Sequence, residues 1–389
     1  MTRIGDTHPT CVIRDIRGLM AWIGFDAIAL GAEAPAHRVS YTSGMLEPPD
    51  LQIVDLAAEL AHSFGLAAAE IVFLPLGADP NTAVYRVIDS ARRAYFLKLR
   101  GSFDPVSVAL PDVLRAYAGA RVIAPLRTRA GGLASRFDRF TLILYPYVDG
   151  RDAWETGLTE PQWHQLGRAL KTLHTLVAPP DLTARIRREA YAPHWRDLTR
   201  AYLARAERET WVEPVAAQGA ALLRARREAI LDLVDRAERL AADLQARPRA
   251  TVICHSDIHA GNVLLDAGGA LHVVDWDDPI LAPKERDLMF IGAGLFGGRR
   301  APEEEEALFY TGYGKTRIDT AALAYYRYER IVTDIAVYGQ GLLDTEAGGE
   351  DRAQSLRYLA SNFEPGQTID LAYRADRSGQ FAAGGSGAM

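Results

Sequence analysis

VICHSDIHAGNVLLD (residues 252–266) and LHVVDWD (residues 271–277) are the two segments that decide the fold. Their apolar residues predict short buried strands, which are separated by a polar loop and by a glycine-rich turn. Three polar residues, Asp257, Asn262 and Asp275, fall on loops at the ends of these strands. Because a rigid scaffold can aim loop residues at one point, we expect the three oxygen-bearing side chains to converge.

A converging set of this kind suits phosphoryl transfer from a nucleotide. One carboxylate must take the proton of the attacking hydroxyl, while an amide oxygen and a second carboxylate hold Mg²⁺ against the phosphates. Asp257 and Asn262 have the Asp-x-x-x-x-Asn spacing of a kinase catalytic loop, and His255 precedes Asp257 as in His-x-Asp. We therefore predict Asp257 as the catalytic base and Asn262 and Asp275 as metal ligands, with His255 bracing the loop through the backbone.

A metal-dependent hydrolase is the main alternative for this segment. His255, Asp257 and His259 alternate as metal ligands on a strand would, and His272 follows nearby. That arrangement requires an unbroken strand, whereas Gly261 and Asn262 favour a loop.

Beyond the loop itself, longer stretches resemble a known family. HSDIHAGN (255–262) followed by VDWD (274–277) is similar to the aminoglycoside phosphotransferases, which share the protein-kinase-like fold. The run from 275 to 292, together with YAPHWR (191–196) and YYRYERIV (325–332), resembles the spectinomycin phosphotransferase branch. The resemblance covers about residues 45–375 and implies ATP and Mg²⁺ as cofactors. It also implies an amino-sugar or aminocyclitol antibiotic as acceptor of the phosphoryl group, with spectinomycin as the leading candidate.

The fold expected from this resemblance is α+β and bilobal. A small antiparallel-sheet N-lobe, residues 49–145, would bind the nucleotide, and a larger mainly helical C-lobe, residues 146–389, would carry catalysis and the acceptor. Residues 1–48 would be a poorly ordered extension. Apolar periodicity predicts a helix over 49–64, strands over 70–76, 83–89 and 94–100, and helices over 162–176 and 220–244.

Several N-lobe residues are candidates for nucleotide binding. The loop that contains Gly77, Asn81 and Thr82 would offer backbone N–H groups to the phosphates. Lys98 matches the phosphate-binding lysine of the family, and either Asp104 or Asp112 would be its carboxylate partner. Asp112 follows Pro111 and would lie in the opening turn of a helix over 110–117. Tyr147, after Pro146, would pack against the adenine base or fill the core.

Composition limits the possible partners. A chain of 389 residues can form two lobes, and its net charge of −6 disfavours binding to nucleic acid while it suits a cationic small substrate. Cys11 and Cys254 are too far apart in sequence to suggest a disulfide framework or a zinc site. The sequence shows neither a membrane span nor a clear signal peptide, so we expect a cytoplasmic monomer or weak homodimer that does not bind membranes.

An acidic, open pocket from the helical lobe should hold a cationic acceptor. The candidates are Asp278, Glu329, Asp334 and Tyr338, although Glu329 and Arg330 could instead form an exposed helix pair. A kinase of the same fold that acts on choline, homoserine or a sugar is one alternative function. A nucleotide-binding protein without transfer activity is another. We expect His174, at the end of a predicted helix, to have a capping or core role.

Overall fold

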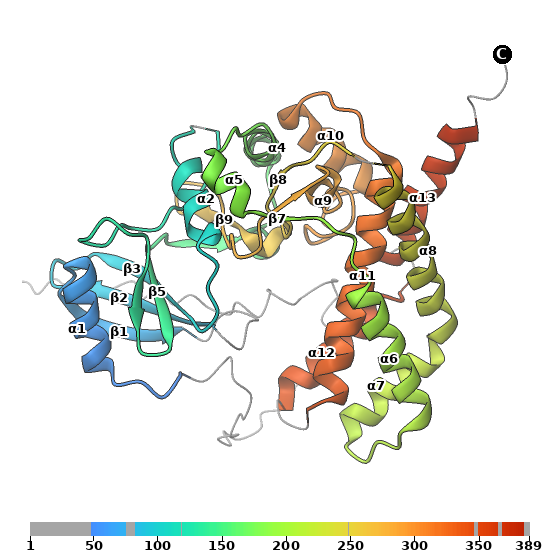
Figure 1. Cartoon of the computed structure of the whole chain (residues 1–389), viewed down its shortest axis with the longest axis horizontal. Coiled ribbons are helices and arrows are strands. Elements are labelled where there is room, and N and C mark those ends of the chain that lie inside the picture. The colour runs from blue at the N-terminus through green and yellow to red at the C-terminus, as the bar shows by residue number, and fades with distance from the viewer. Residues whose placement is uncertain are drawn as a thin grey trace, which may run out of the picture.

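The computed structural model of the chain describes residues 48–74, 82–117, 119–247, 249–345, 349–364 and 368–384. The predicted N-terminal extension lies outside these ranges except for Pro48. A part built on a β-sheet lies beside a larger, mainly helical part (Figure 1). This is the predicted mixed fold with an antiparallel sheet in the N-terminal part.

Five antiparallel strands form the N-terminal sheet, in the order β1-β2-β3-β5-β4. Alternation along the strands buries one face, and Tyr85, Leu97 and Leu99 are nearly inaccessible to solvent. Helix α1 covers this face with Leu56 and Leu60. The strands are β1 (Ala68–Leu74), β2 (Thr82–Asp89), β3 (Ala94–Arg100), β4 (Ser135–Phe137) and β5 (Phe140–Pro146), and α1 spans Ile53–Phe64.

The first three strands confirm the predicted meander, but the helix that follows differs from the prediction. Helix α2 spans Val106–Leu114, so it begins before the predicted residue 110 and encloses Pro111. Its start is fixed by Asp104, because the Oδ1 atom of Asp104 accepts a hydrogen bond from the N–H of Val106 at 2.9 Å. Asp112 therefore lies near the end of the helix rather than in its opening turn.

The remaining helices form the C-terminal part. Helix α4 begins with a capping box between Thr159 and Gln162, and its prediction over 162–176 is close to the observed bounds. Figure 1 shows α11 running through the middle of the helices α6, α7, α8, α12 and α13. The helices are α3 (Ala153–Thr156), α4 (Glu160–His174), α5 (Pro180–Arg185), α6 (His194–Arg208), α7 (Pro214–Ala225), α8 (Arg227–Ala246), α9 (Glu285–Leu288), α10 (Pro302–Tyr313), α11 (Thr320–Leu343), α12 (Gly349–Ser361) and α13 (Thr368–Gly384).

The single helix predicted over 220–244 is wrong. The segment is divided between α7 and α8 at Arg226, whose φ of −105° and ψ of 8° are not helical. Periodicity alone could not reveal this break, because the apolar residues on both sides, such as Leu223 and Ile230, are buried in the same cluster with α11.

Helices α4 and α10 approach closely because each carries a glycine at the contact. A Cβ atom at Gly167 would meet the carbonyl oxygen of Phe309, and one at Gly312 would meet the carbonyl oxygen of His164. Backbone atoms cannot move aside as a flexible side chain can, so only glycine fits at these two positions. The close contact sets the position of α4, which carries His174 at its end.

Two small sheets carry the loops of the candidate site. One has the strand order β10-β9-β6 and the other β7-β11-β8. In the first, Val263 on β9 pairs with Val273 on β10 in antiparallel register. The strands are β6 (Gly150–Asp152), β7 (Arg187–Arg188), β8 (Val252–Cys254), β9 (Val263–Asp266), β10 (Leu271–Val273) and β11 (Ile280–Ala282).

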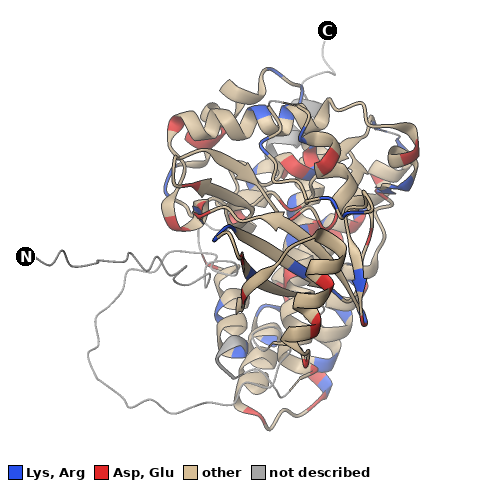
Figure 2. Cartoon of the chain, turned by 90° about the vertical axis from the view of Figure 1, so that its left-hand side faces the viewer, with Lys and Arg blue, Asp and Glu red and all other residues tan. Residues whose placement is uncertain are grey.

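The charged residues are distributed over the molecule without a face of one sign in the view of Figure 2, where Lys and Arg alternate with Asp and Glu. Within the described ranges, no helix combines the length and the apolar character needed to cross a bilayer.

Glu305 on α10 makes stability depend on pH. This residue is 1% exposed, and its Oε2 atom makes no hydrogen bond within the part of the chain that the structure describes. Burial raises the pKa of its carboxyl to about 7, from an ordinary value of 4.5. A raised folded-state pKa favours the protonated form, so this contribution to stability is complete below about pH 4.5 and is lost as the pH rises through 7.

Glu305→Gln cannot ionise, so we expect it to exceed the wild type in stability at pH 8 but not at pH 5. The gain should be on the order of 3 kcal/mol, as the pKa shift implies. Denaturant unfolding at the two pH values measures it. Glu303→Gln, an exposed position on the same helix, is the control and should show no such gain. An equal stability difference at both pH values would refute the assignment.

Candidate active site

The catalytic loop brings Asp257 and Asn262 together. After β8, the chain passes through Asp257 and makes one 3₁₀ turn, Ala260–Asn262, which is capped by His259. The turn folds Asn262 back, so that its Nδ2 atom donates to the backbone oxygen of Asp257 at 2.8 Å and lies 3.3 Å from Asp257 Oδ2. The two residues predicted to face one point are therefore neighbours.

Asp275 joins them from the end of β10. The N–H of Val274 donates to the backbone oxygen of Asn262 at 3.0 Å, which ties this strand end to the catalytic loop. Asp275 itself has a φ of 64°, a left-handed conformation that is uncommon for a residue other than glycine and that occurs often at functional sites. The negative charge of Asp257 acts on Asp275, as expected for carboxylates that share one site.

Lys98 on β3 reaches this site from the N-terminal sheet. Its Nζ atom lies 3.0 Å from Asp275 Oδ1 and 2.7 Å from Asp277 Oδ2. Burial alone would lower the pKa of Lys98, but the two carboxylates outweigh burial and raise it. The lysine is therefore a fixed positive charge at the point where the sheet and the catalytic residues meet.

Asp277 is held by a second cation, Arg100, in an ion pair. Burial and the neighbouring Asp275 raise the pKa of the Asp277 carboxyl, whereas the pKa of Asp275 is lowered because Lys98 outweighs the effect of burial. Of the two carboxylates, Asp275 is thus the one whose environment most favours the charged form that a metal ion requires.

The predicted partner of Lys98 is wrong. Asp112 pairs with Arg115 and Arg127, and Asp104 accepts a hydrogen bond from the Val106 N–H at the start of α2. The early start of α2 places both carboxylates in local interactions, so Lys98 pairs with the acidic residues of the C-terminal part instead.

The other nucleotide-binding candidates lie in or beside the same sheet. Gly77 and Asn81 fall outside the described residues, and Thr82 begins β2. Tyr147 is half-buried, and the Arg86 guanidinium lies 5.2 Å from the centre of its ring. Tyr147 is thus already engaged in a cation–π contact on the sheet.

Asp287 braces the catalytic loop from α9. Its Oδ1 atom accepts from the N–H of Ser256 at 2.7 Å, and its Oδ2 atom accepts from the N–H of His255 at 2.9 Å. His174 contributes a third contact, with its Nε2 atom 2.9 Å from Asp287 Oδ2, while its Nδ1 atom lies 2.8 Å from the Tyr313 hydroxyl. The predicted core role of His174 is confirmed, and it links α4 to the catalytic loop.

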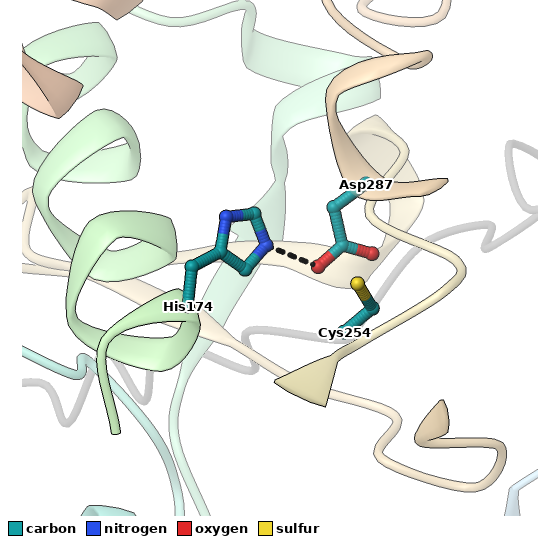
Figure 3. A group of neighbouring side chains, drawn as sticks. All are labelled: His174, Cys254 and Asp287. Atoms are coloured by element: carbon teal, nitrogen blue, oxygen red, sulfur yellow. Dashed lines mark hydrogen bonds and ion pairs between the residues drawn. The ribbon is translucent and has the colours of Figure 1, made fainter. Parts of the chain in front are cut away.

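Cys254 lies beside this pair, as Figure 3 shows, so that three possible metal-ligating side chains are grouped together. Both oxygens of Asp287 and both ring nitrogens of His174 already have hydrogen-bond partners. Burial, reinforced by the charge of Asp287, raises the pKa of the Cys254 thiol well above its usual value. The group is therefore a hydrogen-bonded brace.

The histidines of the hydrolase alternative do not converge on a metal. His255 Nε2 lies 2.9 Å from the backbone oxygen of Val274, which confirms the predicted bracing role of His255. His272 Nε2 lies 3.1 Å from Asp266 Oδ2, at the turn between β9 and β10. His259 Nε2 lies 3.5 Å from Asp257 Oδ2, whereas His255 faces the backbone of this residue, since its Nδ1 atom accepts from the Asp257 N–H at 3.3 Å.

Two of the four acceptor candidates are already paired within the protein. Glu329 is buried and lies 2.6 Å from Arg196 Nη1 on α6, and Asp334 pairs with Arg330 at 3.1 Å. The alternative of an exposed pair between Glu329 and Arg330 is thus wrong, because Glu329 is buried and pairs with Arg196. Asp278 is exposed beside the site, and Tyr338 is half-buried near Asp334, whose charge acts on its hydroxyl.

Sequence reasoning missed Arg330 and Asp287 as parts of the site. Arg330 Nη1 lies 2.6 Å from Asp257 Oδ1. Partial burial would raise the pKa of the Asp257 carboxyl, but Arg330 and then His259 hold it well below its usual range. Asp287 did carry a signal, since a carboxylate directly before the apolar run Leu288–Ile291 must be buried with hydrogen-bond partners.

The profile of the phosphotransferase enzyme family matches residues 71–326. The crystal structure of spectinomycin phosphotransferase APH(9)-Ia in complex with ADP and spectinomycin is 34% identical, with a TM-score of 0.78, and the match covers 84% of this chain and 99% of that one.

Two further matches agree with these. The AMP-bound complex of APH(9)-Ia is 33% identical with a TM-score of 0.73, over 82% of this chain and 98% of that chain. Protein StrN of Streptomyces griseus is 29% identical over 227 residues, which are 55% of this chain and 67% of StrN. The family match extends over more than half of the chain and includes Lys98, Asp257, Asn262 and Asp275. The chain therefore belongs to the phosphotransferase enzyme family.

Proposed function

We propose that the protein transfers the γ-phosphoryl group of ATP to a hydroxyl of an aminoglycoside or aminocyclitol antibiotic, with spectinomycin the first acceptor to test. The observation that carries this proposal is the convergence of Asp257, Asn262 and Asp275 with Lys98, which the contacts between Lys98 and Asp275 complete. Phosphoryl transfer requires a base, metal ligands and a fixed cation together at one point.

In this proposal residues 49–145 form the nucleotide-binding lobe and residues 146–389 the catalytic lobe. Lys98 would bind the phosphates, with Gly77, Asn81 and Thr82 as candidates for further phosphate contacts and Tyr147 as the candidate for the adenine base. Lys98 contacts Asp275 and Asp277 and is already positively charged, so it can bind a phosphate beside these carboxylates without taking up a proton.

Asn262 and Asp275 would hold Mg²⁺. The donor set fits, because Mg²⁺ prefers carboxylate and amide oxygens, and because the Asn262 amide nitrogen faces Asp257, which directs its carbonyl oxygen to the opposite side. When bound, the metal ion neutralises charge on the phosphate oxygens. The other roles that the protein has in the reaction belong to its own side chains.

Asp257 acts on the acceptor. The acceptor hydroxyl oxygen forms a bond to the γ-phosphorus while the bond from phosphorus to the β–γ bridging oxygen breaks, and ADP leaves with that electron pair. The hydroxyl proton passes to Asp257 and then to solvent. Because Asp257 is held ionised beside Arg330, it is ready to accept this proton at neutral pH.

Spectinomycin is supported as the acceptor by the similarity to APH(9)-Ia, which was crystallised with ADP and spectinomycin. Asp278 and Tyr338 remain the candidates for acceptor contacts in this chain. A metabolic alcohol such as choline, homoserine or a sugar is the second candidate. Of these, an uncharged sugar agrees best with the pairing of Glu329 and Asp334 with arginines, which leaves fewer carboxylates for a cation.

A transfer assay with γ-labelled ATP distinguishes these possibilities. The purified protein is incubated with spectinomycin, with other aminocyclitols and aminoglycosides, and with choline, homoserine and a sugar. We expect label to pass to spectinomycin with much higher kcat/KM than to any metabolic alcohol. Preferential transfer to a metabolic alcohol would favour the second candidate, and binding of ATP without any transfer would contradict both.

A further inference from the structure

Arg330 on α11 connects the catalytic loop to this helix. Its Nη1 atom lies 2.6 Å from Asp257 Oδ1, and its Nε atom lies 3.1 and 3.3 Å from the two oxygens of Asp334, one turn further along the helix. The guanidinium also lies 5.7 Å from the centre of the Phe290 ring. Three neighbours on different sides therefore fix the plane of this guanidinium.

This contact makes the two oxygens of Asp257 unequal. Oδ1 accepts a short, charge-assisted hydrogen bond from Arg330. Among the residues that the structure describes, Oδ2 has longer contacts, at 3.3 Å to Asn262 Nδ2 and 3.5 Å to His259 Nε2. Because Asn262 Nδ2 makes its shorter bond, 2.8 Å, to the backbone oxygen of Asp257, Oδ2 is the more weakly held of the two carboxylate oxygens.

We propose that Arg330 is a positioning residue for phosphoryl transfer: it holds Oδ1 of Asp257, so that Oδ2 is the oxygen presented to the acceptor hydroxyl. This role rests on the proposed function of Asp257. Arg330 takes no proton itself, since a guanidinium stays charged in proteins. The proton moves from the hydroxyl to Oδ2, and Asp334 holds Arg330 from the other side.

The planar fork of Arg330 matters as much as its charge. Its Nη1 and Nε atoms bind two different carboxylates at once, whereas a lysine offers one point charge on a flexible stem. Loss of this alignment should reduce kcat rather than nucleotide binding. Arg330 contacts Asp257, the proposed general base, whereas Lys98, the residue proposed to bind the phosphates, contacts Asp275.

The test compares Arg330→Ala and Arg330→Lys with the wild type, using both transfer to the acceptor and hydrolysis of ATP by water. We expect kcat of Arg330→Ala to fall by about 10²-fold, the usual cost of a small misplacement of a catalytic group, with little change in KM for ATP. Guanidinium ions, far below concentrations that unfold proteins, should restore part of kcat. Arg330→Lys keeps the charge and the fold but should remain slower than the wild type.

Arg196→Ala is the matched control. Arg196 also pairs with a carboxylate of α11, Glu329, and is buried, but its hydrogen bonds go to Glu329, Tyr325 and Tyr191 rather than to Asp257. Its loss should reduce the melting temperature, and guanidinium should not raise its kcat. Rescue in Arg330→Ala and not in Arg196→Ala supports the positioning role.

The role of Arg330 would be overturned if Arg330→Ala had the kcat of the wild type, or if guanidinium raised kcat equally in Arg330→Ala and Arg196→Ala. Neither result would affect the proposed function. A wild-type protein that consumes no ATP, with or without an alcohol, would overturn the proposed function and this role with it. The two failures are thus told apart, since the second is seen in the wild type before any variant is compared.

Discussion

Asp257→Asn is expected to lower kcat by roughly 10²–10⁴-fold, the usual contribution of a general base. The asparagine fills the same space and can still accept a hydrogen bond from Arg330 through its amide oxygen, but it cannot take the proton of the acceptor hydroxyl. Lys98 and Asp275 are unchanged, so nucleotide binding should persist. Steady-state kinetics and titration with a non-hydrolysable ATP analogue measure the two effects separately.

The control for this variant is Asp235→Asn, an exposed carboxylate on α8 that pairs loosely with Arg200 at 3.4 Å. It removes the same charge far from the site and should leave kcat unaltered. Should Asp257→Asn turn over as fast as this control, Asp257 would not be the base. A variant that lost nucleotide binding instead would place Asp257 on the phosphate side.

Asp287→Asn is expected to destabilise the fold by roughly 3–5 kcal/mol, as is typical when one partner of a buried charged network is removed. Asp287 has no exposed surface, and it accepts from the backbone N–H groups of His255 and Ser256 and contacts His174. An asparagine would turn an NH₂ group toward donors that need an acceptor. Denaturant unfolding monitored by circular dichroism measures the loss, and kcat should fall as the catalytic loop loosens.

Asp266→Asn is a closely matched control for the brace. Asp266 also accepts from two backbone N–H groups, those of Gly268 and Ala270, at 2.9 and 2.8 Å, and also contacts a histidine, His272. Its side chain is 29% exposed and lies in a turn, so water can replace the lost bonds. If both variants lost the same stability, burial would not be the reason that Asp287 matters.

Much of the fold could be predicted because the relevant signals are local. The strand over 94–100 was predicted at its observed bounds, since alternation along β3 buries Leu97 and Leu99 on one face. The helical break at Arg226 and the early start of α2 were missed. Apolar periodicity records neither the backbone conformation of Arg226 nor the hydrogen bond from the Val106 N–H to Asp104 at the start of α2.

The convergence of Asp257, Asn262 and Asp275 could be predicted for a similar reason. The spacing within one loop and one hairpin keeps these three residues near each other in the sequence and in the structure. Lys98 was predicted to join them through the resemblance alone, because a strand from a distant part of the sequence brings it to the site.

The partner of Glu329 could not be predicted from the sequence. Asp112 was a candidate partner of Lys98, and Glu329 and Asp334 were candidates for a cationic acceptor, but each pairs with an arginine of the chain. For Glu329 that arginine lies on another helix, so the pair depends on how α6 packs on α11. Sequence spacing within one helix contains no information about such a contact.

The measurement that tests the central claim most directly is phosphorus NMR of the purified protein with ATP, Mg²⁺ and spectinomycin. If the groups around Asp257 and Lys98 transfer phosphate directly to a hydroxyl, one phosphomonoester of spectinomycin should appear for each ADP formed. The same mixture with Asp257→Asn should remain nearly unchanged. Release of inorganic phosphate in place of the monoester, or equal monoester formation by Asp257→Asn, would contradict the account.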